Sequence, residues 1–65
     1  MTIAFIGAGN MAGSLIRGLQ ASGYLPGEIV AADPAQSQLD VLSALGIATT
    51  TDNARAVAEA DIIVL

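Results

Sequence analysis

The sequence contains no cysteine, no histidine and no lysine, and its only basic side chains are Arg17 and Arg55. Disulfide bonds and Cys/His metal sites are therefore excluded, because both need residue types that the chain lacks. Two cations against six acidic residues give a net charge of −4. Such a chain has no basic patch for a nucleic-acid backbone or an anionic membrane surface, so we expect neither partner.

Long apolar runs and a targeting segment are also missing. No apolar run approaches the ~18 residues of a membrane span, and no cationic segment precedes the first apolar run, which argues against a secretory signal. Together with the lack of cysteine, this predicts a cytoplasmic protein. Hydrophobic residues nevertheless make up 54% of the 65 residues. A chain this short and this apolar predicts a core piece of a larger protein rather than a complete fold.

Short apolar runs alternate with segments of helical periodicity along the whole chain. Strands buried on both faces are predicted at 3–6, 28–32, 47–50 and 62–65. Helices are predicted between them, at 10–22, 34–45 and 53–60. This β-α-β-α-β-α-β alternation predicts an α/β fold with a Rossmann-type, doubly wound parallel sheet of strand order 3-2-1-4. We expect residues 1–65 to be the N-terminal part of such a domain, because the fourth strand would keep an unpaired edge.

The helical periodicity also predicts which side chains are buried. For the first helix, the apolar stripe comprises Met11, Ala12, Leu15, Ile16 and Leu19. The second helix is expected to start with Asp33 as its cap and Pro34 at its first position. Its buried face comprises Leu39, Leu42 and Leu45. Gly23 and Gly46 are expected to end these two helices.

The segment Gly7–Ala12 matches the dinucleotide fingerprint G-x-G-x-x-A. In that motif the first glycine allows a tight turn, and Gly9 lets a pyrophosphate approach the backbone. The N–H groups around Asn10 and Met11, in the first helical turn, have no intrahelical acceptor and can hold a pyrophosphate without a basic side chain. The alternative is a glycine-rich turn that merely joins a strand to a helix. The preceding strand, the following helix and an acid after the second strand favour cofactor binding.

Two polar positions follow the next strands at the same sheet edge. Asp33 can accept hydrogen bonds from the adenosine ribose, and it would repel a 2′-phosphate, which favours NAD over NADP. Asn53 can bind a cofactor ribose or adenine. For both residues, and for Asp52, the alternative role is helix capping. No serine has a base partner, so we expect no catalytic residue in this chain.

The segment 3–11, I-A-F-I-G-A-G-N-M, with L-I-R-G-L at 15–19 and S-G at 22–23, resembles the amino terminus of pyrroline-5-carboxylate reductases. The segments L-P-G-E-I at 25–29 and A-D-I-I at 60–63 extend the resemblance over the whole chain. This family reduces 1-pyrroline-5-carboxylate to L-proline with NADPH or NADH. The resemblance implies a pyrophosphate cradle of Ile6, Gly7, Ala8, Gly9, Asn10 and Met11, with Asp33 and Asn53 at further cofactor contacts.

The resemblance also has implications beyond these residues. In the family, an A-V-K-P segment and a helical dimerisation domain follow, so we expect a homo-oligomer whose substrate site lies outside this chain. The chain alone is then not expected to be catalytic. Asp33 departs from the Ser, Thr or Asn that family members often have there, which puts a strict NADPH preference in doubt.

Three alternatives remain open. The first is a 3-hydroxyacid dehydrogenase of the 6-phosphogluconate dehydrogenase type, which shares F-I-G-x-G-x-M. The second is an S-adenosylmethionine-binding methyltransferase, which also pairs a glycine-rich first turn with an acid after the second strand. The third is a structural fragment that binds no cofactor and whose exposed edge pairs with another copy.

Overall fold

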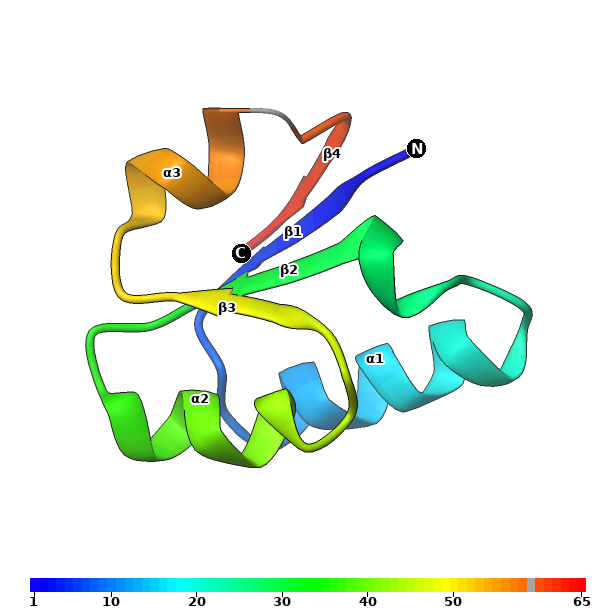
Figure 1. Cartoon of the computed structure of the whole chain (residues 1–65), viewed down its shortest axis with the longest axis horizontal. Helices are drawn as coiled ribbons and strands as arrows, with labels where there is room; N and C mark the ends of the chain where they lie inside the picture. Colours follow the sequence, from blue (N-terminus) through cyan, green and yellow to red (C-terminus); the bar gives the residue numbers. More distant parts are fainter. Residues whose placement is uncertain (59) are drawn as a thin grey trace.

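The computed structural model describes residues 1–58 and 60–65. In chain order its elements are β1 (Ile3–Ile6), α1 (Asn10–Ala21), the 3-10 helix η1 (Pro26–Glu28), β2 (Ile29–Ala32), α2 (Gln36–Ser43), β3 (Ala48–Thr50), α3 (Asn53–Ala58) and β4 (Ile62–Val64). The four strands form one parallel sheet in the order β3-β2-β1-β4 (Figure 1). The predicted α/β fold and its strand order are therefore confirmed.

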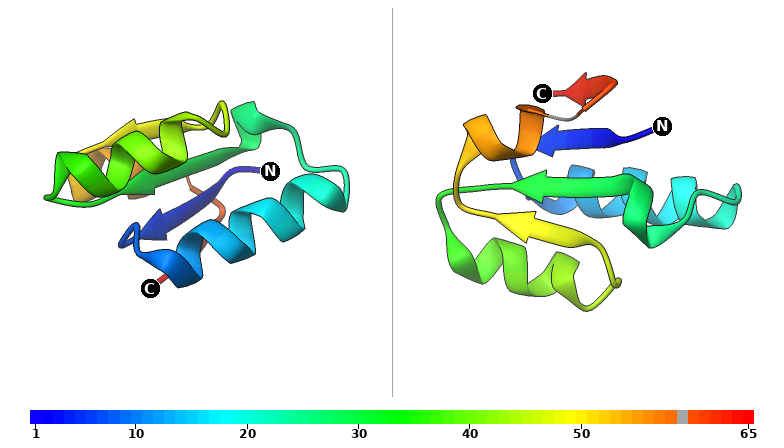
Figure 2. Two further views of the ribbon diagram at one scale, coloured as in Figure 1. Left: turned by 90° about the horizontal axis from the view of Figure 1, so that it is seen from below. Right: turned by 45° about the horizontal axis from the view of Figure 1, so that its top comes forward.

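Helices cover both faces of the sheet. Helices α1 and α2 lie on one face and α3 lies on the other, as the views in Figures 1 and 2 show. The α1–α2 face holds the larger buried cluster, to which β1 contributes Ile3 and Phe5. The α3 face holds a smaller cluster of alanines, to which β1 contributes Ala4. Because side chains alternate along a strand, burial on both faces explains why β1 is an unbroken apolar run.

The predicted stripe of α1 is confirmed in part, because Ile16 is buried and Ala12 and Leu19 pack against the same cluster. Gly13 and Ile16 are the buried residues of the helix, whereas Met11 is 78% and Leu15 47% exposed. A Cβ added to Gly13 would lie 3.7 Å from a methyl carbon of Leu42. The close approach to α2 therefore occurs at a residue without a side chain. Sequence periodicity that counts only apolar side chains misses such a contact, and it included the exposed Met11 and Leu15 in the stripe.

The start of α2 also differs from the prediction. Its N-cap is Ala35 and its first helical residue is Gln36, so the helix begins two residues beyond the expected Pro34. The Asp33 carboxylate accepts a hydrogen bond from the Ala35 N–H at 2.8 Å, which closes a local Asx turn before the helix. This turn satisfies the Ala35 N–H before the helix, and the first backbone hydrogen bonds of the helix run to the Ala35 carbonyl. Asp33 is therefore not the helix cap.

The remaining boundaries agree with the prediction to within one or two residues. Leu39 and Leu42 are buried as expected, and Leu45 packs partly buried against the same cluster. Gly23 and Gly46 follow the ends of α1 and α2 with φ values of 103° and 85°. The helix predicted at 53–60 is observed over Asn53–Ala58, and residue 59 lies outside the described residues.

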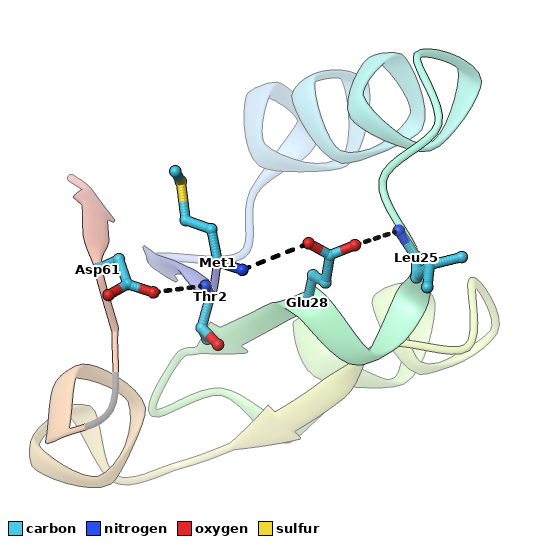
Figure 3. Close-up of polar contacts among 5 residues, drawn as sticks. All are labelled: Met1, Thr2, Leu25, Glu28 and Asp61. Atoms are coloured by element: carbon cyan, nitrogen blue, oxygen red, sulfur yellow. Dashed lines mark hydrogen bonds and ion pairs between the residues drawn. The ribbon is translucent and has the colours of Figure 1, made fainter.

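Polar contacts connect the amino ends of three strands (Figure 3). The Thr2 N–H donates to the Asp61 carboxylate at 2.9 Å, and the Met1 amino group pairs with Glu28 at 3.6 Å. Glu28 also accepts a hydrogen bond from the Leu25 N–H at 3.1 Å. Because ligands of parallel sheets bind at the carboxyl ends of the strands, these contacts lie at the edge opposite to the expected site.

Gly18 offers a simple test of the orientation of α1. It lies inside the helix, and an added Cβ would meet no atom within 4 Å. Because glycine weakens a helix by about 0.8–1 kcal/mol relative to alanine, we expect Gly18→Ala to raise the free energy of unfolding by about 0.5–1 kcal/mol. Urea unfolding followed by circular dichroism measures the change. A decrease would mean that position 18 faces a packed neighbour.

Candidate functional site

The turn between β1 and α1 lies at the carboxyl edge of the sheet. Gly7 follows the last residue of β1 with φ of 106°, a backbone conformation that side-chain-bearing residues rarely adopt. Its N–H donates to the carbonyl oxygen of Ala32 at 2.7 Å. The turn is therefore anchored to the end of β2, and the glycine at position 7 is needed for its backbone geometry.

Gly9 is needed for a different reason. It is the N-cap of α1, with φ of −77° and ψ of −172°, which any residue can adopt. An added Cβ would meet no protein atom within 4 Å. The missing side chain thus leaves open space directly over the first turn of α1, where a pyrophosphate fits against the backbone.

The first turn of α1 has unsatisfied hydrogen-bond donors. The first backbone bond of the helix runs from the Gly13 N–H to the Gly9 carbonyl at 3.2 Å. Within residues 1–58 and 60–65, the N–H groups of Asn10, Met11 and Ala12 donate no hydrogen bond, and no side chain caps this helix. These N–H groups and the positive end of the helix dipole attract an anion, and no acidic residue lies in this turn to compete.

Ala8 is the buried residue of the turn between β1 and α1. Its side chain is 3% exposed, and its N–H donates to Asp33 Oδ2 at 2.9 Å. The N–H groups of Gly7 and Ala8 are both bonded within the chain, so they face no ligand. The ligand-facing donors therefore begin at Gly9 rather than at the first residue of the predicted cradle.

Two hollows meet at Gly9. The smaller, of about 190 Å³, lies between the turn and β4, and Ile6, Met11, Leu15 and Val64 are among its lining residues. The larger, of about 310 Å³, lies between the turn and α2, and Asn10, Arg17 and Gln38 are among its lining residues. Gly9 lines both. A ligand with two ends and a negatively charged middle matches this arrangement.

Arg17 was missed as a site residue because it lies two turns into α1. Its side chain runs back along the helix, so that Nη1 lies 3.8 Å from where a Cβ on Gly13 would be. The signal in the sequence was the spacing of four residues, since helical side chains tilt toward the N-terminus. Arg17 forms no ion pair within the part of the chain that the structure describes. The hollow beside α2 therefore contains one cation.

Asn53 follows β3 at the same edge of the sheet. Asp52 Oδ1 accepts hydrogen bonds from the N–H groups of Ala54 at 2.9 Å and Arg55 at 3.3 Å. Asp52 therefore caps α3, and the capping role considered for Asn53 falls to its neighbour. The Asn53 side chain is exposed and forms no hydrogen bond to any residue that the structure describes.

Residues 1–58 and 60–65 contain neither a metal-binding cluster nor a membrane-spanning helix. No group of three or more Asp, Glu, His or Cys side chains there could hold a metal ion. None of the helices in those ranges has the length and apolar character needed to cross a membrane.

Comparison with known proteins gives consistent matches. The family model described as NADP oxidoreductase coenzyme F420-dependent matches residues 2–65. Pyrroline-5-carboxylate reductases of Pseudomonas aeruginosa and Vibrio alginolyticus are 50% and 47% identical over 64 residues, which are 97% of this chain but 23% and 24% of those proteins. A solved pyrroline-5-carboxylate reductase from Coxiella burnetii is 38% identical, with a TM-score of 0.90 over 95% of this chain and 23% of that chain.

The resemblance of this chain to the amino-terminal part of pyrroline-5-carboxylate reductases is therefore confirmed. The chain spans about a quarter of the length of the relatives that it matches.

Proposed function

Because this chain belongs to the family described as NADP oxidoreductase coenzyme F420-dependent, we propose that it is the cofactor-binding part of an NAD(P)H-dependent pyrroline-5-carboxylate reductase. In this proposal residues 1–65 form the N-terminal part of a dinucleotide-binding domain. The intact protein reduces the C=N bond of 1-pyrroline-5-carboxylate to give L-proline. Three relatives that carry the name of this enzyme support the proposal.

The observation that carries the proposal is the position of Gly9. A dinucleotide is two nucleosides joined by a pyrophosphate, so its site needs an anion-binding corner between two hollows. Gly9 lines both hollows, and open space lies where its side chain would be. We assign the pyrophosphate to the N–H groups that follow Gly9. S-adenosylmethionine has no phosphate and offers only a carboxylate, so it supplies less negative charge to these donors than a pyrophosphate does.

The two halves of the cofactor are assigned from the fold. In parallel nucleotide-binding sheets the adenosine lies toward the end of the second strand, which here is the side of Asp33 and the hollow with Arg17. The nicotinamide half then occupies the hollow beside β4, against Met11 and Val64. When bound, the reduced nicotinamide supplies the hydride. Asn53 is assigned to a further contact on the adenosine side.

The choice between NADH and NADPH depends on the charges near the adenosine 2′ position. Asp33 repels a 2′-phosphate, whereas Arg17 attracts one from the neighbouring hollow. The sequence suggested a preference for NAD because no basic residue follows Asp33. Arg17 partly offsets that preference, so we propose that the site accepts NADPH or NADH.

In this proposal the chain binds the cofactor but supplies no side chain for proton transfer to the substrate. It has no histidine, cysteine or lysine to donate a proton. We therefore propose that residues outside this chain form the substrate site, and that the intact protein is a cytoplasmic homo-oligomer.

Exchange of the corresponding segment in a relative tests the proposal. Residues 1–65 replace the matching first quarter of the Pseudomonas aeruginosa enzyme, which is 50% identical over this stretch. We expect the chimaera to oxidise NADPH or NADH only when 1-pyrroline-5-carboxylate is present. A folded chimaera that binds neither cofactor would contradict the proposed function. Titration of the chain itself with S-adenosylmethionine tests the methyltransferase alternative.

A further inference from the structure

Each oxygen of the Asp33 carboxylate accepts a hydrogen bond from the backbone. Oδ2 accepts a hydrogen bond from the Ala8 N–H at 2.9 Å, and Oδ1 accepts one from the Ala35 N–H at 2.8 Å. The first bond joins residues 25 positions apart and is partly buried. One side chain thus connects the glycine turn after β1 to the segment between β2 and α2.

Ala8 lies between the two glycines of the turn. Gly7 and Gly9 flank it, and glycine loses more backbone freedom on folding than any other residue type. The Gly7 N–H is bonded to Ala32 on one side, and α1 begins after Gly9 on the other. The Ala8 side chain is buried in the core cluster, and the bond to Asp33 is the hydrogen bond that orients the peptide between Gly7 and Ala8. The peptide groups that follow it carry the donors that face the ligand.

We infer that Asp33 is a positioning residue, which orders the glycine turn for the pyrophosphate through Ala8. This inference rests on the proposed function, because it assigns a role within the same cofactor site. It differs from the expected role of Asp33, in which the carboxylate reads the adenosine ribose. A site ordered in advance binds more tightly because less conformational freedom is lost on binding. The pyrophosphate is common to NADH and NADPH, so Asp33 supports both cofactors.

The two roles predict different results for Asp33→Ser. A ribose-reading carboxylate predicts weaker NADH binding and relatively better NADPH binding, since a repulsive charge is removed. A positioning carboxylate predicts that the dissociation constants of both cofactors rise. Because a hydrogen bond to a charged group is lost, we expect a rise of about tenfold for NADH. The rise for NADPH is smaller, because the repulsion between Asp33 and the 2′-phosphate is removed as well.

Asp61→Ser is the matched control. Asp61 accepts a backbone hydrogen bond of the same length, from the Thr2 N–H at 2.9 Å (Figure 3). That bond lies at the amino edge of the sheet, away from the glycine turn. The control removes the same charge and the same kind of bond, and we expect it to leave both dissociation constants unchanged.

The experiment combines calorimetry and NMR on the 65-residue chain. Titrations with NADH and with NADPH give the dissociation constants for wild type, Asp33→Ser, Asp33→Asn and Asp61→Ser. Amide hydrogen exchange at Ala8 is measured without cofactor, and we expect it to accelerate at least about tenfold in Asp33→Ser. Asp33→Asn keeps one acceptor oxygen and is expected to give intermediate values. Unchanged amide shifts outside the turn confirm that each variant is folded.

The outcomes are distinct. A rise for both cofactors, with faster exchange at Ala8, supports the inference. A rise for NADH alone, or an unchanged affinity in a folded Asp33→Ser variant, overturns it while the proposed function stands. If the wild-type chain is folded by its NMR spectrum and binds neither cofactor, the proposed function fails and the inference fails with it.

Discussion

Gly9→Val is expected to abolish measurable binding of NADH and NADPH while the fold is retained. A Cβ at this position meets no protein atom within 4 Å, and its φ of −77° is open to every residue, so valine fits the folded chain. The same side chain fills the space that the pyrophosphate needs over the first turn of α1. We expect the dissociation constants to rise by at least about 100-fold, equivalent to about 2.7 kcal/mol.

Calorimetric titration measures the affinity and thermal unfolding measures the stability of the same samples. Gly18→Ala is the matched control, because it adds a side chain to another unobstructed glycine of the α1 region, away from the turn. Gly7→Ala provides the contrast: its φ of 106° is strained for alanine, so stability should fall by about 1 kcal/mol or more. Undiminished affinity in Gly9→Val would contradict the proposal that the pyrophosphate binds at the first turn of α1.

Ile16→Ala is expected to have the largest effect on stability. Ile16 is fully buried in the cluster between α1 and the sheet. Truncation of a buried isoleucine leaves a cavity and lowers the free energy of unfolding by about 2–5 kcal/mol. A domain of this size has little stability to lose. We therefore expect the variant to be largely unfolded at 25 °C, as measured by circular dichroism and urea titration.

Leu15→Ala is the control in the same helix. Leu15 is 47% exposed and lines the hollow beside β4. We expect a loss of less than about 1 kcal/mol, because little apolar area is removed from the core. If the two variants had equal effects, Leu15 would be buried to the same extent as Ile16, as the predicted stripe has it, and the described packing would be wrong.

The sequence allowed the sheet to be predicted because each strand carries its own local signal. An unbroken apolar run such as Ile3–Ile6 can be stable only between two helical layers, and alternating helices then require a parallel sheet. The glycine turn was equally readable. Gly7 and Gly9 stand where the motif needs a positive φ and an open space, and both properties depend on a single residue and its neighbours.

The roles of Asp33 and Arg17 were not readable in the same way. Capping and ribose binding were both open for Asp33 because its partner, the Ala8 N–H, lies 25 residues away. Arg17 looked remote from the turn, although the tilt of helical side chains brings it back beside Gly13. In each case the role depends on a neighbour that only the crossing of two elements provides.

The sequence alone determined the parallel α/β architecture, its strand order and the glycine turn between β1 and α1, because the alternation of periodic segments and the individual glycines specify these features. Only the tertiary structure decided which face of α1 is buried, where α2 begins and which donors of the turn remain open to a ligand. Those features depend on where α1, α2 and the end of β2 meet in space. A contact between distant residues leaves no periodic signal in the chain.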